Sequence, residues 1–157
     1  MTITWEGGQK FVIKTKQLTV KIGEKINLGE LEISEPGEYE VAGVQVDQID
    51  GVIQIYAEGI NVSHIKKGKV LTDDELEKLN GVDILLIGVG AEGFTETKTA
   101  LEMISQIDPA IVIPMAKGDV SEFTKEEGKN EPVDELKISK GELPQDDRQI
   151  VILNARG

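Results

Sequence analysis

The sequence contains no cysteine and only one histidine, His64, among its 157 residues. Without cysteine the chain has no disulfide bonds, no thiolate zinc sites and no thiol nucleophiles. A single histidine cannot build an ordinary zinc site, which takes three or four ligands that are mostly histidine and cysteine. Aromatic residues make up 4% of the chain, and no apolar run approaches the roughly 20 residues that span a bilayer. Any metal site would therefore depend on carboxylates.

Basic residues are also few, since 17 of them face 29 acidic residues and give a net charge of −12. The acidic residues are scattered along the chain, and we interpret their excess mainly as a source of solubility. Such a chain repels phosphate backbones, so we expect no nucleic-acid partner. The first residues, MTITWEGGQK, lack a basic start followed by an apolar run. We therefore expect no secretory signal, no membrane partner and a cytoplasmic location.

The first half of the sequence has the period-2 pattern of short β-strands. Alternating segments are expected at 11–23, 25–34, 35–49 and 51–65. We expect a bulge at Gly43 and a hairpin turn at Ala57-Glu58-Gly59. Short antiparallel strands in series predict a β-meander.

Helix signals appear in the second half. Thr72 and Glu75 have the spacing of a capping box, which predicts a short helix that Gly81 can end in the left-handed conformation. A second, amphipathic helix is expected at 95–108, with Thr95 as its N-cap. Weaker helix signals lie at 121–127 and 132–136.

The second helix lies between two strands expected to be buried on both faces. The first is the near-continuous apolar run 82–90, and the other starts at Ala110 and is broken by Pro114. This strand–helix–strand order predicts a βαβ unit, and a last strand is expected at 148–154. No linker or repeat interrupts the chain, so we predict a single domain over residues 1–157.

Gly88, Gly90 and Gly93 form a Gly-x-Gly-x-x-Gly motif after a strand and before a helix, the context of a dinucleotide-binding turn. Two features weaken this interpretation. The expected N-cap, Thr95, lies beyond the third glycine, and the acid expected about 20 residues further on is missing. We keep nucleotide binding as a third hypothesis beside a plain glycine-rich loop.

His64, at the end of an expected strand, is interpreted as a hydrogen-bonded structural residue. The alternative makes it one ligand among carboxylates. Asp47, Asp50 and Asp119 could gather with it and hold Mg²⁺ or Mn²⁺ in an oxygen-rich site.

Four stretches occur in a recognisable order over most of residues 3–116: ITWEGGQKFVIKTK, PGEYEVAGV, VSHIKKGKVLTDDELEKLNGVDILLIGVG and FTETKTALEMISQIDPAIVIPM. Together they resemble the metallo-β-lactamase superfamily, most closely its branch of ascorbate-6-phosphate-lactonase-like metal-dependent hydrolases. The resemblance implies an α/β (α+β) protein, a shortened αββα sandwich of two mixed sheets. It also implies a site at one edge, between the sheets.

Compared with that family, the ligand positions are altered. Gly8 stands where the family has the histidine of Gly-His-Ser, Lys67 aligns with a bridging aspartate, and Ala116 aligns with the last ligand. The His-x-His-x-Asp-His loop is missing, and His64 matches a residue that is not a ligand. The resemblance thus implies a set of vestigial site positions: Gly8, Asp47, Asp50, His64, Lys67, Ala116 and Asp119.

A lysine in place of a bridging carboxylate repels a divalent cation. Without a metal, water keeps a pKa near ~15.7, and no hydroxide nucleophile forms at neutral pH. Our leading hypothesis is therefore a metal-free protein without catalytic residues or cofactors, which acts as a binding or assembly module. It could form homo-oligomers through an exposed sandwich edge. The alternative is a metal-dependent hydrolase with a rebuilt carboxylate-rich site.

Overall fold

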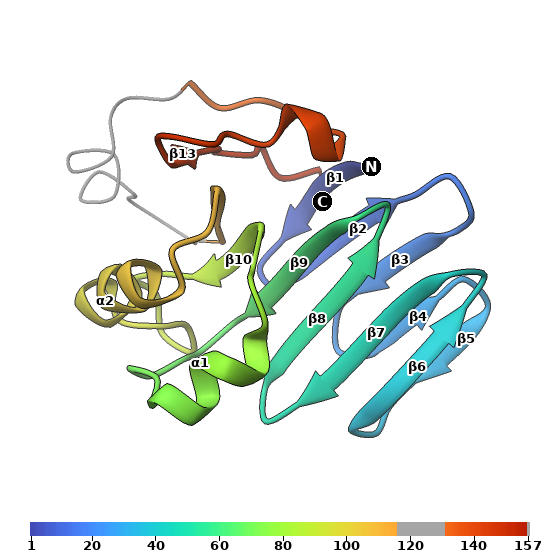
Figure 1. Cartoon of the computed structure of the whole chain (residues 1–157), viewed down its shortest axis with the longest axis horizontal. Coiled ribbons are helices and arrows are strands. Elements are labelled where there is room, and N and C mark those ends of the chain that lie inside the picture. The colour runs from blue at the N-terminus through green and yellow to red at the C-terminus, as the bar shows by residue number, and fades with distance from the viewer. Residues whose placement is uncertain (116–130, 157) are drawn as a thin grey trace.

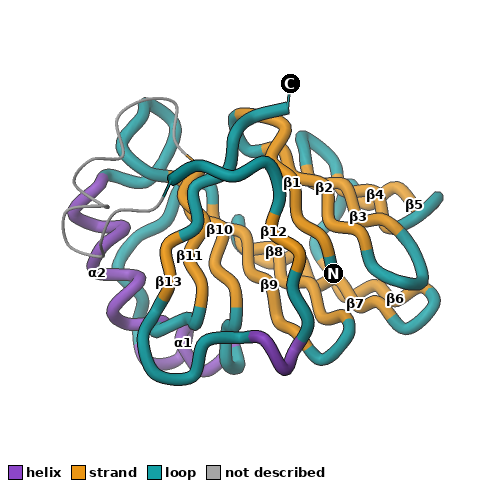
Figure 2. The backbone as a smooth tube through the Cα atoms, turned by 90° about the horizontal axis from the view of Figure 1, so that it is seen from above, coloured by secondary structure: helices purple, strands orange, loops and turns teal. Residues whose placement is uncertain are grey.

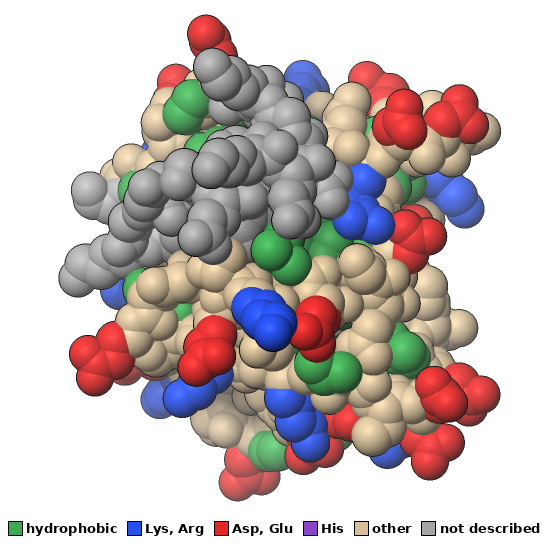
Figure 3. Space-filling model, turned by 90° about the vertical axis from the view of Figure 1, so that its left-hand side faces the viewer, with side chains coloured by type: hydrophobic (Ala, Val, Ile, Leu, Met, Phe, Trp, Pro, Cys, Tyr) green, Lys and Arg blue, Asp and Glu red, His purple; other side chains and the backbone are tan. Residues whose placement is uncertain are grey.

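The computed structural model describes residues 1–115 and 131–156. These residues form two β-sheets that pack face to face, with two α-helices beside one of them (Figures 1 and 2). Charged side chains of both signs are interspersed over the face that carries the helices (Figure 3). In the described ranges, no helix has the length and apolar character needed to cross a membrane.

Sheet A is an antiparallel meander with one additional strand at its edge. Its order is β12-β1-β2-β3-β4-β5, with β1 at Thr2–Gly7, β2 at Lys10–Lys14, β3 at Thr19–Ile22, β4 at Ile26–Leu28, β5 at Leu31–Ile33 and β12 at Leu136–Lys137. Apolar residues such as Phe11 and Ile13 face inward, whereas Lys14 and Lys21 are exposed. A sheet with one polar face needs no covering layer on that side.

Sheet B is mixed and has the order β13-β11-β10-β9-β8-β7-β6. The strands are β6 at Gly37–Val41, β7 at Val44–Ile49, β8 at Val52–Ala57, β9 at Ile60–Ile65, β10 at Ile84–Gly88, β11 at Ile111–Met115 and β13 at Gln149–Ile150. Strands β6 to β9 pair antiparallel, whereas β9, β10, β11 and β13 run parallel. All five residues of β10 are buried, as predicted for a strand covered on both faces.

Both α-helices pack on the outer face of sheet B. Helix α1, Asp73–Leu79, begins at the predicted Thr72–Glu75 capping box. Helix α2, Thr97–Ile107, connects β10 to β11. A short 3-10 helix, η1, follows at Lys140–Glu142.

Two apolar clusters hold these layers together. The larger lies between the sheets and contains Ile13 and Leu28 from sheet A with Val62 and Leu86 from sheet B. The smaller joins sheet B to the helices and includes Leu85, Met103 and Ile104. The shortened metallo-β-lactamase-like sandwich predicted from the sequence is confirmed, with the difference that sheet A is antiparallel throughout its described strands.

Several local predictions were wrong. Gly43 is not a bulge, because Ala42 and Gly43 both have positive φ and form a two-residue turn between β6 and β7. Pro114 does not break its strand, since β11 continues through it to Met115. Residues 132–136 form no helix, and the strand expected at 148–154 is limited to β13. The signal at 121–127 lies outside the described residues.

The predicted N-cap of α2 was also wrong. The helix begins after Glu96, which makes no side-chain capping bond. Thr95 instead accepts a hydrogen bond from the backbone N–H of Gly68 at 3.0 Å and donates one to the carbonyl oxygen of Lys66 at 3.3 Å. Thr95 therefore ties the loop before α2 to the end of β9.

Candidate functional site

The candidate site lies where parallel strands β9 and β10 end beside the turn between β1 and β2. Their register pairs Leu86 with His64 and Ile87 with Ile65, so both strands end at the same edge of the sheet. In open α/β sheets, ligands bind outside the carboxyl ends of the strands. The seven vestigial site positions named above, which include His64, were expected around such an edge.

His64 projects between the two sheets. It is 3% exposed, and its Nε2 lies 2.9 Å from the carbonyl oxygen of Gln9, in the β1–β2 turn. A carbonyl oxygen can only accept, so Nε2 carries the hydrogen. The ring of Phe11 meets the imidazole edge-on, with centroids 5.8 Å apart. His64 is thus a buried, hydrogen-bonded residue, as the sequence analysis interpreted it.

Aromatic packing extends from His64 toward the turn. Trp5 stacks on Phe11 at a centroid distance of 6.5 Å, and its indole N–H donates to the carbonyl oxygen of Gly8 at 2.9 Å. The chain's only tryptophan and only histidine therefore belong to one cluster. The alternation of residues along each strand did not predict that these side chains meet.

Burial lowers the pKa of His64 to about 4, because a charged imidazolium loses its hydration between the sheets. The hydrogen bond to Gln9 raises the pKa but does not offset the effect of burial. The imidazole is consequently neutral at physiological pH. Its Nε2 carries the hydrogen donated to Gln9, and its lone pair is on Nδ1.

The other named positions that the structure describes come from separate places in the fold. Asp47 lies on the outer face of β7, since Val46 and Gln48, its neighbours, occupy the inward-facing positions of the ladder that contains His64. Asp50 lies in the exposed turn between β7 and β8, and Lys67 is exposed after β9. Gly8 is an exposed turn residue with positive φ. Ala116 and Asp119 lie outside the described residues.

These residues do not fit the metal centre that the fold family implies. Within residues 1–115 and 131–156, no three His, Cys, Asp or Glu side chains are grouped so that they could hold a metal ion. Asp47 and His64 lie on opposite faces of sheet B, and Lys67 adds a positive charge near the strand ends. The described residues give no donor set for a bridging divalent cation.

The backbone geometry and close packing at positions 88, 90 and 93 explain why glycine stands there. A side chain at Gly88 would collide with the carbonyl oxygen of Lys66 and with Phe94. Gly90 and Gly93 have positive φ. The backbone N–H of Gly90 donates to Thr95 at 2.7 Å. Because α2 starts only at Thr97, the glycines do not open a helix in the way a dinucleotide-binding turn requires.

Two packed sheets, helices outside the mixed sheet and a candidate site at the strand ends define a shortened sandwich of the metallo-β-lactamase type. The chain belongs to that superfamily, because the family model described as Beta-lactamase superfamily domain matches residues 3–116.

Solved structures show the same architecture. A candidate Zn-dependent hydrolase of the metallo-β-lactamase superfamily from Thermotoga maritima is 25% identical, with a TM-score of 0.82 over 98% of this chain and 100% of that chain. A metallo-hydrolase from the hyperthermophilic archaeon Ignicoccus hospitalis is 12% identical, with a TM-score of 0.60 over 80% of this chain and 89% of that one. The latter likeness concerns the fold alone. No match was found among curated proteins.

Proposed function

We propose that this chain is a degenerate, non-catalytic member of the β-lactamase superfamily, from its lactonase-like branch, and that it acts as a metal-free binding module. The family relationship concerns the scaffold, whereas the loss of activity is inferred from the residues at the strand ends. Neither the substrates nor the metals of its relatives are carried over to this chain.

The observation that supports the proposal is the environment of His64. His64 is a neutral imidazole whose Nε2–H is donated to Gln9 and whose ring packs on Phe11, so only its Nδ1 lone pair is left as a donor. In the described residues, no three His, Cys, Asp or Glu side chains are grouped so that they could complete a metal site around it. Metal binding through Nε2 would also break the buried hydrogen bond and leave the Gln9 carbonyl without its partner. The lysine at position 67 opposes a cation further.

Metal analysis of the untagged full-length chain tests this proposal. The chain would be purified from cultures supplemented with zinc, manganese and iron, and analysed by elemental mass spectrometry. We expect no stoichiometric metal, and no change in thermal unfolding after EDTA treatment. Hydrolysis of phosphodiester, ester and lactone test substrates should stay at the buffer rate with each metal added.

A reproducible content of about one metal ion per chain, or turnover that EDTA abolishes, would refute the proposal. Such a result would favour the rebuilt-site alternative. A double variant, Asp47→Asn with Asp50→Asn, would then test it, since that site needs both carboxylates.

A further inference from the structure

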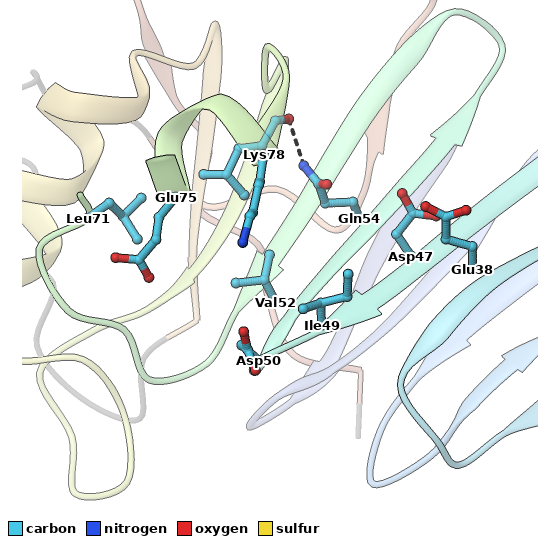
Figure 4. Close-up of a pocket in the computed structure, with 10 residues that line it drawn as sticks. Glu38, Asp47, Ile49, Asp50, Val52, Gln54, Leu71, Glu75 and Lys78 are labelled. Carbon is cyan, nitrogen blue, oxygen red and sulfur yellow. Dashed lines mark hydrogen bonds between the residues drawn. The ribbon is translucent and has the colours of Figure 1, made fainter. Parts of the chain in front are cut away.

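A groove runs along the outer face of sheet B, beside α1 and over β7 and β8 (Figure 4). It has a volume of about 350 Å³. Strands β6 to β8 and the turn after β7 form one side, and α1 with the segment before it forms the other. The lining residues are Glu38, Asp47, Ile49, Asp50, Val52, Gln54, Leu71, Glu75, Lys78 and Leu79.

The floor of this groove is apolar and partly exposed. Ile49 is 50% exposed, and Val52 and Leu71 are partly buried. Ile49 is one of the four large hydrophobic side chains that are exposed in the described part of the chain. Exposed apolar surface within a polar rim is typical of an interaction site.

The floor is also held in place. The side-chain amide of Gln54 donates to the carbonyl oxygen of Leu79 at 2.7 Å, which fixes the end of α1 against β8. Its amide oxygen accepts from the hydroxyl of Tyr56 at 3.0 Å. The groove therefore exists before anything binds, so a ligand need not order it.

Carboxylates surround one end. Glu38 and Asp47 are cross-strand partners on β6 and β7 and lie side by side at this end, whereas Asp50, in the turn after β7, lies near Ile49 and Val52 (Figure 4). Burial raises the pKa of Tyr56, and the negative charges of Asp47 and Glu38 raise it further. This end thus has a negative potential that favours a positively charged partner.

A second hollow of about 340 Å³ continues the groove, since both are lined by Asp50, Val52, Leu71 and Glu75. Its far end carries Lys67 and Lys69. The combined groove therefore has carboxylates at the end formed by Glu38 and Asp47 and lysines at the other end. Its middle mixes apolar side chains with Asp50, Glu75 and Lys78. An elongated surface with this charge order matches a polypeptide segment better than a compact small molecule.

We propose that this groove binds an amphipathic segment of a partner protein. Lysine or arginine side chains of the segment lie against Glu38 and Asp47, apolar side chains cover Ile49 and Val52, and a carboxylate lies near Lys67. The inference deepens the proposed function, on which it rests, by naming the binding surface and the chemistry of the partner. A second copy is disfavoured as occupant, because each chain carries a net charge of −12.

Synthetic peptides and the untagged full-length chain provide the test. The probe is a labelled peptide of about 14 residues with lysines at one end, leucines at helical spacing in the middle and glutamates at the other end. A scrambled peptide of the same composition is the control. Fluorescence anisotropy measures affinity, and NMR shift changes locate the contact. We expect saturable binding of the ordered peptide that shifts the amides of Ile49, Val52 and Leu71.

Charge reversals give matched controls. Asp47→Lys should weaken binding at least about tenfold. Lys67→Glu should also weaken binding, because it repels the glutamates of the peptide. Glu30→Lys, in the exposed β4–β5 turn, makes the same change in net charge away from the groove and should leave the affinity within about twofold. Circular dichroism establishes that each variant is folded.

The proposal fails if the scrambled peptide binds equally well, if Glu30→Lys weakens binding as much as Asp47→Lys, or if the shifted amides lie elsewhere. It also fails if light scattering shows self-association that buries the groove. Metal content and turnover test the non-catalytic proposal, whereas peptide binding tests the groove. The failure of one proposal can therefore be distinguished from the failure of the other.

Discussion

The buried imidazole of His64 should make the stability of this protein depend on pH. In the unfolded chain its pKa is the ordinary 6.5, and in the folded protein burial lowers the pKa to about 4. Because the folded value lies below the unfolded one, acid favours the unfolded chain. The stabilisation is complete above about pH 6.5 and is lost progressively as the pH falls toward about 4.

The magnitude follows from linkage. At about pH 5 the unfolded imidazole is almost fully protonated and the folded one mostly neutral, which costs about 2 kcal/mol relative to about pH 7.5. The full difference between the two pKa values corresponds to about 3 kcal/mol. Carboxylates also begin to titrate in this range, so the wild-type curve alone does not isolate the histidine.

The substitution His64→Gln isolates it, because a glutamine can still donate to the Gln9 carbonyl but does not titrate. Urea unfolding of both proteins at each pH gives four free energies. We expect the wild type to lose about 2 kcal/mol more than the variant between the two conditions, whatever the fixed cost of the substitution.

An NMR titration gives a second, direct measurement. The chain has one histidine, so the imidazole signals of the untagged protein need no assignment. They should stay constant from about pH 8 to pH 5.5. A midpoint near 6.5, or the same pH dependence in the variant as in the wild type, would refute the burial of a neutral imidazole.

Three further substitutions test the scaffold by urea unfolding. Gly88→Ala should destabilise by more than about 2 kcal/mol, because its Cβ meets the Lys66 carbonyl, whereas Gly141→Ala, with open space around it, should cost less than about 1 kcal/mol. Thr72→Ala removes the cap of α1 and should cost about 1 kcal/mol, whereas Thr72→Ser should largely preserve stability. Leu86→Ala, at a fully buried position, should cost about 2–5 kcal/mol. The exposed Leu31→Ala should change stability by no more than about 0.5 kcal/mol, and equal effects at both positions would contradict the assigned core.

The features predicted correctly from the sequence are those fixed by short-range chemistry. The Thr72–Glu75 spacing located α1, and the run around Leu86 identified a strand buried on both faces. Glycines in turns were harder to interpret, because a glycine in a hairpin turn and a glycine in a bulge differ only in how the flanking strands pair. Gly59 was correctly placed in a hairpin, whereas Gly43 was assigned to a bulge although Ala42 also adopts positive φ. An alanine gives no signal for that conformation.

The site was less predictable, because its arrangement depends on contacts between distant segments. Residues 9 and 64 meet through one hydrogen bond, and nothing local in either segment indicates that contact. The opposite orientations of Asp47 and His64 follow from the pairing register across β7, β8 and β9, where a shift of one residue would exchange the faces. The groove combines β6, β8 and α1, so only the folded arrangement brings it together.

The proposed metal-free state is compatible with the way in which the core is built. The main core runs between the sheets, from Leu28 in β4 to Leu86 in β10, and is formed by aliphatic side chains in both halves of the sandwich. A cluster of carboxylates without its cation would be repulsive and unsatisfied. At the strand ends, the stack of Trp5, Phe11 and His64 buries apolar surface and satisfies its polar atoms through Gly8 and Gln9. Under the proposed metal-free function, this packing stands in place of such a cluster, and the outer groove is the proposed binding surface.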